Sequence, residues 1–171
     1  MRDPLARPEL LIRRVYAYVA YRLGDGPEAE DITSATFERA LRYRTSFDAR
    51  RGEPVAWLIG IARRCIADAA QGDVPLPVAD EATEGHEDAV VLRLELRRGL
   101  ARLTGREREL LSLRYGADLT ARQIAQLLDM NTNAVEVALH RALASLRLVM
   151  DTRSEASTGA SELGWLPQSR T

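Results

Sequence analysis

The stretch LTARQIAQLLDMNTNAVEVALHRALASL, residues 119–146, decides the fold of the second half of the chain. It opens with Thr120 and Gln123 in the spacing of a capping box, which predicts the start of a helix. Ile124, Leu127 and Leu128 follow at helical spacing, and after residues 129–132 a longer helical pattern carries Val135, Leu139, Ala142, Leu143 and Leu146. Asp129 suits a left-handed turn position. A short helix, a tight turn and a longer helix are the order of a helix-turn-helix.

A further helix pair is predicted just before this motif. A leucine stripe at 92, 96, 100 and 103 ends before Thr104, which forms a second capping box with Glu107. The helix that follows is expected to reach Tyr115 and to end at Gly116.

Three helices are predicted in the first 70 residues. The first carries Ile12, Val15, Tyr16, Val19 and Leu23 and stops at Gly24; the second opens at Pro27 with Ala29, Ile32, Thr36, Ala40 and Tyr43; the third opens at Pro54 with Val55, Leu58, Ile59, Ala62, Ile66 and Ala69. No strand pattern competes with them. We therefore expect an all-α protein of two small helical domains.

The segment between these domains, residues 71–88, is predicted to be a flexible acidic linker. It holds two prolines, two glycines and six carboxylates and no arginine, which gives a net charge of −6. Residues 1–70 carry +2, residues 89–150 carry +4 and residues 151–171 carry −1, so the overall charge of −1 conceals two mildly basic domains. Residues 151–171 are rich in Ser, Thr, Gly and Ala and are expected to form a mobile tail.

Several function classes find no support in the sequence. No apolar run approaches the ~20 residues of a membrane span, and the N-terminus lacks the apolar core of a secretory signal, so we expect a cytoplasmic protein without membrane insertion. Cys65, His86 and His140 have no partners at metal-ligand spacing, and we expect neither a metal nor a cofactor. No convergent nucleophile and base appear, so an enzyme is not expected. All 24 basic residues are arginine, which suits phosphate and base-edge contacts but also fits codon bias alone.

Two sets of motifs resemble the sigma-70 family, in its small extracytoplasmic-function group. Region 2 is matched by the runs 29–32 (AEDI), 36–37 (TF), 47–48 (FD), 56–58 (AWL) and 61–63 (IAR). Region 4 is matched by the residues 106–111, 114–115 (RY), 119–120 (LT), 124–125 (IA) and 139–142 (LHRA). The resemblance implies a sigma factor that binds core RNA polymerase, recognises the minus-ten and minus-thirty-five promoter elements and melts DNA. It also implies regulation by an anti-sigma protein and a linker that follows the path of nascent RNA.

In this family region 2 contacts the clamp helices of the polymerase and the minus-ten element. The resemblance assigns the clamp contact to Asp31, Thr36, Phe37 and Arg39, although Phe37 equally fits the core and Asp31 a first-turn acid. It assigns capture of unstacked minus-ten bases to Arg42, Arg44, Arg50 and Arg51, and contacts upstream of them to Arg63 and Arg64. Trp57 is expected to pack inside.

Region 4 in this family reads the minus-thirty-five element and touches the polymerase beta flap. The residues that the resemblance assigns to DNA are Arg122, Thr132, Asn133, Glu136, Val137, His140, Arg141 and Arg147. Glu136 and Val137 stand where basic and hydroxyl side chains are usual, and the basic run expected after the third helix is absent. Glu can accept a hydrogen bond from cytosine, Val can meet a thymine methyl, and Arg141 can fork onto guanine.

Two other functions fit the same residues. A free-standing helix-turn-helix regulator would bind duplex DNA without polymerase. A sigma-like adaptor or decoy would bind polymerase and start no transcript.

Overall fold

The computed structural model describes the backbone of residues 3–71 and 87–162, and the side chains of residues 3–70 and 91–151. Within these ranges the chain forms seven α-helices and two short helical turns, η1 and η2, with no strand. The predicted all-α fold is confirmed for the described residues. None of the described helices combines the length and the hydropathy that crossing a membrane requires.

The N-terminal half contains α1 (Pro8–Leu23), α2 (Pro27–Arg42) and α3 (Pro54–Gln71), with the 3₁₀ turn η1 (Arg44–Ser46) between the last two. Proline occupies the first turn of α1 and α2, where its missing N–H costs nothing. Gly24 and Gly26 join these helices with φ values of +104° and +135°, a region of backbone space that glycine enters without strain. The predicted helix starts at Pro27 and Pro54 are confirmed.

The buried face of α1 differs from the predicted stripe. Val15 and Val19 are fully buried as predicted, whereas Ile12 is 45% exposed, and Leu11 and Tyr18 are buried instead. The reason is that α1 packs on two sides, against α2 and α3 and also against η2 of the C-terminal half. A hydrophobic stripe inferred from the sequence of α1 alone cannot reveal that η2 also packs against this helix.

The C-terminal half contains α4 (Glu87–Arg102), α5 (Gly105–Leu111), the π-helical turn η2 (Ser112–Gly116), α6 (Ala121–Leu128) and α7 (Thr132–Glu162). Both predicted capping boxes are present, one of Thr104 with Glu107 and one of Thr120 with Gln123. Arg108 donates hydrogen bonds to the carbonyls of Leu100, Ala101 and Leu103 at and just after the end of α4, where helix carbonyls lack intrahelical partners.

Two predicted boundaries differ from the structure. The linker was expected over 71–88, but α3 includes Gln71 and α4 begins at Glu87; residues 72–86, with the predicted flexibility, lie outside the described residues. The tail was expected from Asp151, but α7 continues to Glu162. That stretch has alanines and glutamates and no proline before Pro167, so nothing in it forces the helix to end. Residues 163–171 lie outside the described residues.

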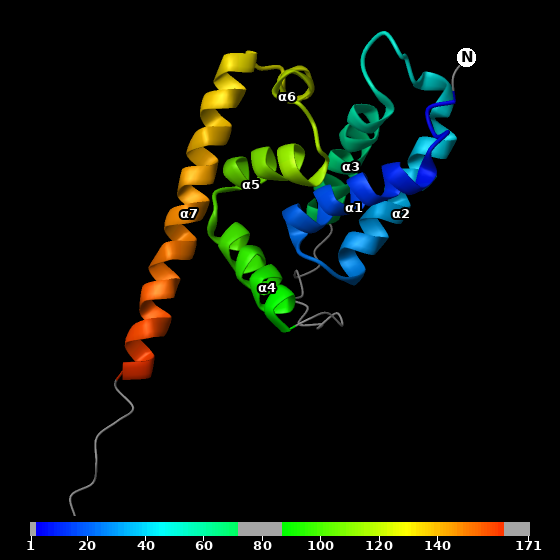
Figure 1. Ribbon diagram of the computed structural model, residues 1–171. Coiled ribbons are helices and arrows are strands. Elements are labelled where there is room, and N and C mark those ends of the chain that lie inside the picture. Colours follow the sequence, from blue (N-terminus) through cyan, green and yellow to red (C-terminus); the bar gives the residue numbers. More distant parts are fainter. Residues whose placement is uncertain (1–2, 72–86, 163–171) are drawn as a thin grey trace, which may run out of the picture.

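The halves share one apolar core. Buried side chains from α1, α2 and α3 form a single cluster with those from α4, α5, η2, α6 and α7. Figure 1 shows α1 lying beside the α5–η2 segment, while α7 runs along the outer side of the C-terminal half and extends past it. The two halves are therefore packed against each other.

Candidate nucleic-acid interface

The helix-turn-helix is fixed by local hydrogen bonds. Asp129 ends α6 in the left-handed conformation, with φ 52° and ψ 52°, as its position in the sequence predicts. The Met130 N–H then donates to the Ala125 carbonyl at 2.8 Å. Asn131 begins α7, because its side-chain oxygen accepts a hydrogen bond from the Asn133 N–H at 2.9 Å. The turn therefore sets the direction in which α7 leaves the motif.

One face of α7 holds the helix in the core and the other is free. Val135 and Ala142 are fully buried and Leu139 is 9% exposed. The predicted reading residues lie on the opposite side at positions 133, 136, 137, 140 and 141, and all five are exposed. Val137 is 51% exposed, so an apolar side chain is available on this face. Arg122, near the start of α6, and Arg147, further along α7, are exposed as well, and Thr132 is half-buried.

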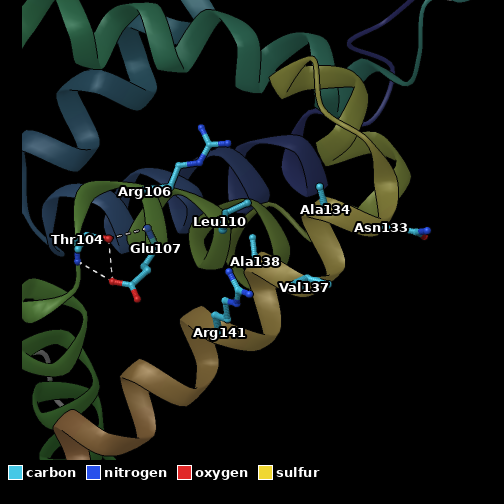
Figure 2. A pocket seen from close by; sticks show the side chains of 9 residues that line it. All are labelled: Thr104, Arg106, Glu107, Leu110, Asn133, Ala134, Val137, Ala138 and Arg141. Carbon is cyan, nitrogen blue, oxygen red and sulfur yellow. Dashed lines mark hydrogen bonds between the residues drawn. The ribbon is translucent and has the colours of Figure 1, made fainter.

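A hollow of about 560 Å³ lies beside this reading face, between the start of α5 and the first turns of α7. In Figure 2 Val137, Ala138 and Arg141 line its α7 side, and Thr104, Arg106, Glu107 and Leu110 line its α5 side. The hollow is open, and its two arginines give it a positive rim. No group of three or more His, Cys, Asp or Glu side chains suited to a metal ion occurs in the part of the chain that the structure describes.

A second basic surface surrounds the loop between α2 and α3. Arg42, Arg44, Arg50 and Arg51 are all exposed there. The loop is shaped by Asp48, whose carboxylate accepts from the Arg50 N–H at 2.9 Å and whose carbonyl accepts from the Arg51 N–H at 3.0 Å. These two hydrogen bonds fix the backbone of the turn, and the Arg50 and Arg51 side chains extend from it into solvent.

An aromatic pair packs this loop against α3. The rings of Phe47 and Trp57 lie 5.5 Å apart at 59°, a tilted arrangement favourable for aromatic side chains. Trp57 is half-buried and packs on the core, so its predicted inward position is confirmed.

Models of two family regions match the chain, Sigma-70 region 2 over residues 9–72 and Sigma-70 region 4 over residues 93–146. The chain is 30% identical over 155 residues to the ECF RNA polymerase sigma factor SigK of Mycobacterium ulcerans, covering 81% of this chain and 80% of that protein. It belongs to the ECF group of the sigma-70 family. This family consists of non-enzymatic proteins that bind RNA polymerase and direct promoter recognition, and the predicted family is confirmed.

This sigma factor also resembles the ECF RNA polymerase sigma factor BldN of Streptomyces coelicolor, with 34% identity over 149 residues. That match covers 80% of this chain but 56% of BldN, so the chain spans little more than half of that relative. Among solved structures, the sigma factor RpoE of Bartonella quintana, in complex with the anti-sigma factor NepR, superposes with a TM-score of 0.69 at 18% identity, covering 84% of this chain and 93% of that one. CnrH, in complex with the cytosolic domain of CnrY, gives 0.62 at 21% identity, covering 86% and 85%. These two likenesses show the shared fold.

The residues assigned to the polymerase contact have different surroundings in this sigma factor. Asp31 is exposed. Arg39 is partly exposed and pairs with Asp68 at 2.7 Å, and Phe37 is half-buried against the core. Thr36 is fully buried and donates to the Ile32 carbonyl at 2.7 Å. Thr36 therefore presents no side-chain surface to a partner in this conformation, and its assignment to the polymerase contact stays a prediction; the helical spacing that suggested a contact is also the spacing of the core face.

The two arginines expected upstream of the minus-ten loop also differ. Arg64 is exposed, whereas Arg63 is half-buried and its Nε lies 2.9 Å from a carboxylate oxygen of Glu109 in α5. No sequence pattern pointed to Glu109 or to the helix-capping Asn131 as site residues. Asn131 could have been found from the preference for Asn just before a helix. Glu109 gave no such signal, because its partners lie in the other half of the chain.

Proposed function

We propose that this sigma factor binds core RNA polymerase through region 2 and reads the minus-ten and minus-thirty-five elements with the two basic surfaces described above. Residues 1–70 and 89–150 act as separate reading units on DNA, with residues 71–88 linking them. The observation that carries the proposal is the exposed face of α7, where polar, apolar and cationic side chains share one side of a helix whose opposite side is buried in the core.

The proposed contact with the minus-thirty-five element has two parts, recognition of base edges and contacts with backbone phosphates. Asn133, Glu136, Val137, His140 and Arg141 share the exposed side of α7 at helical spacing. Asn133 can recognise adenine, Glu136 cytosine, Val137 the thymine methyl and Arg141 guanine. Arg122 and Arg147 lie beside them and supply phosphate contacts, and Thr132 lies at the helix start. With few cations on this face, affinity for DNA depends on the polymerase more than on the isolated helix.

The minus-ten contact uses the arginines at 42, 44, 50 and 51, together with Arg64 and, once it is released from Glu109, Arg63. Guanidinium planes stack on unpaired bases and follow a single-stranded backbone. The exposed Asp31, the partly exposed Arg39 and the edge of Phe37 contact the clamp helices, and region 4 contacts the beta flap. The protein acts in the cytoplasm, where polymerase and promoters lie, and an anti-sigma protein covers it when it is inactive.

Run-off transcription with core polymerase tests this proposal. Arg141→Ala is expected to weaken minus-thirty-five recognition by about 1 to 3 kcal/mol, roughly 5- to 150-fold, and to relax preference at one base position. Arg102→Ala, an exposed arginine of α4 outside the reading face, is the matched control and should transcribe as the unchanged protein does. Equal transcript levels from Arg141→Ala across promoter variants would remove Arg141 from the site.

The purified protein, promoter DNA and core polymerase also distinguish the two alternative functions. Specific retardation of duplex DNA without core polymerase would favour a free-standing regulator. Binding to core without a transcript from any promoter would favour a decoy.

A further inference from the structure

Another hollow, of about 530 Å³, lies between the turn that joins α1 to α2 and one side of α4. It shares no residue with the two surfaces assigned to promoter DNA. The charged side chains that line it are four arginines and two carboxylates, so the lining carries a net charge of +2. These side chains are Arg22 of α1, Arg97 and Arg98 of α4, Arg108 of α5, Asp25 in the turn and Glu28 of α2.

Two of these arginines are held in place by the protein itself. Arg108 donates through Nε and Nη2 to three backbone carbonyls at the end of α4. Arg22 donates through Nη1 to the Gly105 carbonyl at 3.3 Å, and its Nε lies 2.8 Å from a carboxylate oxygen of Glu109. Neither Nη1 of Arg108 nor Nη2 of Arg22 donates to another residue that the structure describes. Each guanidinium therefore keeps one terminal nitrogen for a ligand without having to move.

The charges around the hollow favour an anion inside it. Burial, and then the positive charge of Arg22, lower the pKa of Arg108. The two guanidiniums therefore repel each other at a site that is partly shielded from water. The Asp25 carboxylate already accepts a hydrogen bond from the Tyr16 hydroxyl. A negative group placed between the arginines would offset their repulsion.

The arginines of α4 supply cations from the other side of the hollow. The Arg97 Nε lies 3.7 Å from the position that a Cβ atom would take on Gly24, so this side chain reaches the turn between α1 and α2. Arg98, the next residue of α4, is exposed. Guanidinium groups bind phosphate through paired N–H donors. Cations on several sides of one hollow suit a ligand with more than one phosphate group.

The rest of the lining is mostly apolar. Tyr21 is half-buried and contributes an aromatic ring, and Leu23, Leu94 and Leu100 lie around the same space. Sites for small organic ligands measure about 300 to 1,000 Å³ and combine an apolar lining with a few polar groups. An aromatic ring can stack on a nucleic acid base of any type. The lining therefore suits a ligand that has both phosphates and a base.

We propose that this hollow binds a nucleoside triphosphate. The phosphates contact the guanidiniums of Arg22, Arg98 and Arg108, and the base lies on Tyr21 and the neighbouring leucines. The proposal does not rest on promoter reading, because the residues of this site are separate from those assigned to DNA.

Isothermal titration calorimetry on the full chain tests the site. The probe is ATP, in a buffer with EDTA so that no divalent cation neutralises its phosphates. Inorganic triphosphate and adenosine are titrated separately as the two parts of the ligand. We expect ATP to bind at least about fivefold more tightly than triphosphate, since stacking of a base adds to the binding. Adenosine should bind more weakly still, and the affinity for ATP should fall as the salt concentration rises.

Two variants test the residues of the site. Arg98→Ala should weaken ATP binding about tenfold, the effect of losing a charged hydrogen bond at an exposed position. Arg102→Ala, which removes an exposed arginine of the same helix outside the hollow, is the matched control and should bind as the unchanged protein does. Tyr21→Leu keeps an apolar side chain but removes the ring, so it should weaken binding of ATP and leave binding of triphosphate unchanged. Far-UV circular dichroism and a melting curve check that each variant is folded.

Three results would overturn the proposal. The first is the absence of both a heat of binding and a rise in melting temperature with ATP, since a ligand that binds the folded state stabilises it. The second is equal weakening by Arg98→Ala and Arg102→Ala, which would mean that ATP meets the general surface charge. The third is triphosphate binding as tightly as ATP with no effect of Tyr21→Leu, which would make the hollow a site for inorganic polyphosphate instead. Failure of run-off transcription would refute the proposed function and leave nucleotide binding unaffected.

Discussion

Glu107 joins the start of α5 to the middle of α7, and its removal should loosen the support of the reading face. Its Oε2 accepts from the Thr104 N–H at 3.0 Å and from the Thr104 hydroxyl at 2.8 Å, and its Oε1 accepts from the Ser145 hydroxyl at 2.6 Å. In the variant the Thr104 hydroxyl still accepts from the residue-107 N–H, so loss of the reciprocal half of the capping box costs up to about 1 kcal/mol. The bond to Ser145 adds about 1 kcal/mol, since water weakens a charged hydrogen bond at a partly exposed site. We expect Glu107→Ala to lower the free energy of unfolding by about 2 kcal/mol.

A double-mutant cycle isolates the bond between the helices. Ser145→Ala and Glu107→Ala are measured alone and together by urea unfolding of the full chain. The expected coupling energy is about 1 kcal/mol, within the range for residues in direct contact. Thr120→Ala serves as the control, because it removes the capping box at the start of α6, whose hydrogen bonds join Thr120 to Gln123. A coupling energy indistinguishable from zero would refute the claim that Glu107 holds α5 against α7.

The lowered pKa of the Glu107 carboxyl predicts that the free energy of unfolding decreases at acidic pH. Hydrogen bonds from Ser145, and then from Thr104, hold the pKa of Glu107 below its ordinary value of 4.5. Because the folded pKa is lowered, this stabilisation is complete above that value and is lost as the pH falls through the lowered pKa. Unfolding of the unchanged protein and of Glu107→Gln, compared at pH 7 and near pH 3, should show a smaller loss in the variant. An equal loss in both would contradict the assignment.

Three further outcomes are expected. Thr120→Ala should cost about 1 kcal/mol and lower the melting temperature by roughly 2 to 4 °C, as a thermal scan would show; no change would mean that the capping box does not support α6. Burial and then Asp25 raise the pKa of Tyr16 to about 12, and burial and then Glu109 raise the pKa of Tyr18. Stability should therefore be complete below pH 10 and fall as the pH rises above it, which unfolding at stepped alkaline pH would reveal; a flat profile would contradict this. Glu136→Gln should change promoter preference more than overall transcript level, and a uniform gain on every promoter would argue against base reading.

Local signals in the sequence were sufficient for most of the C-terminal half. The two capping boxes at Thr104 and Thr120 and the left-handed Asp129 each act within a few residues, so their spacing alone predicted where helices begin and end. The exposed side of α7 followed in the same way, because the buried positions 135, 139 and 142 define the opposite face.

The features that escaped prediction depend on contacts between distant residues. Tyr18 and Glu109 are 91 residues apart, and no periodicity within α1 or α5 reveals that one is the partner of the other. Thr36 shows a different difficulty. The family resemblance assigns it to a contact surface, but its place in the helical stripe is also that of a core residue, and in the structure it is buried. The length of α7 was underestimated because residue composition distinguishes poorly between an extended helix and a tail.

The single apolar core has a genetic consequence. Buried residues of α1 and η2 belong to the same cluster. Mutations in the two promoter-reading regions should therefore not act independently of each other in the free protein. A substitution that disturbs the buried residues of α1 in region 2 should also lower the stability of region 4, and a change in η2 should lower the stability of region 2. Suppressor mutations of one region should therefore accumulate in the other, where α1 packs against η2.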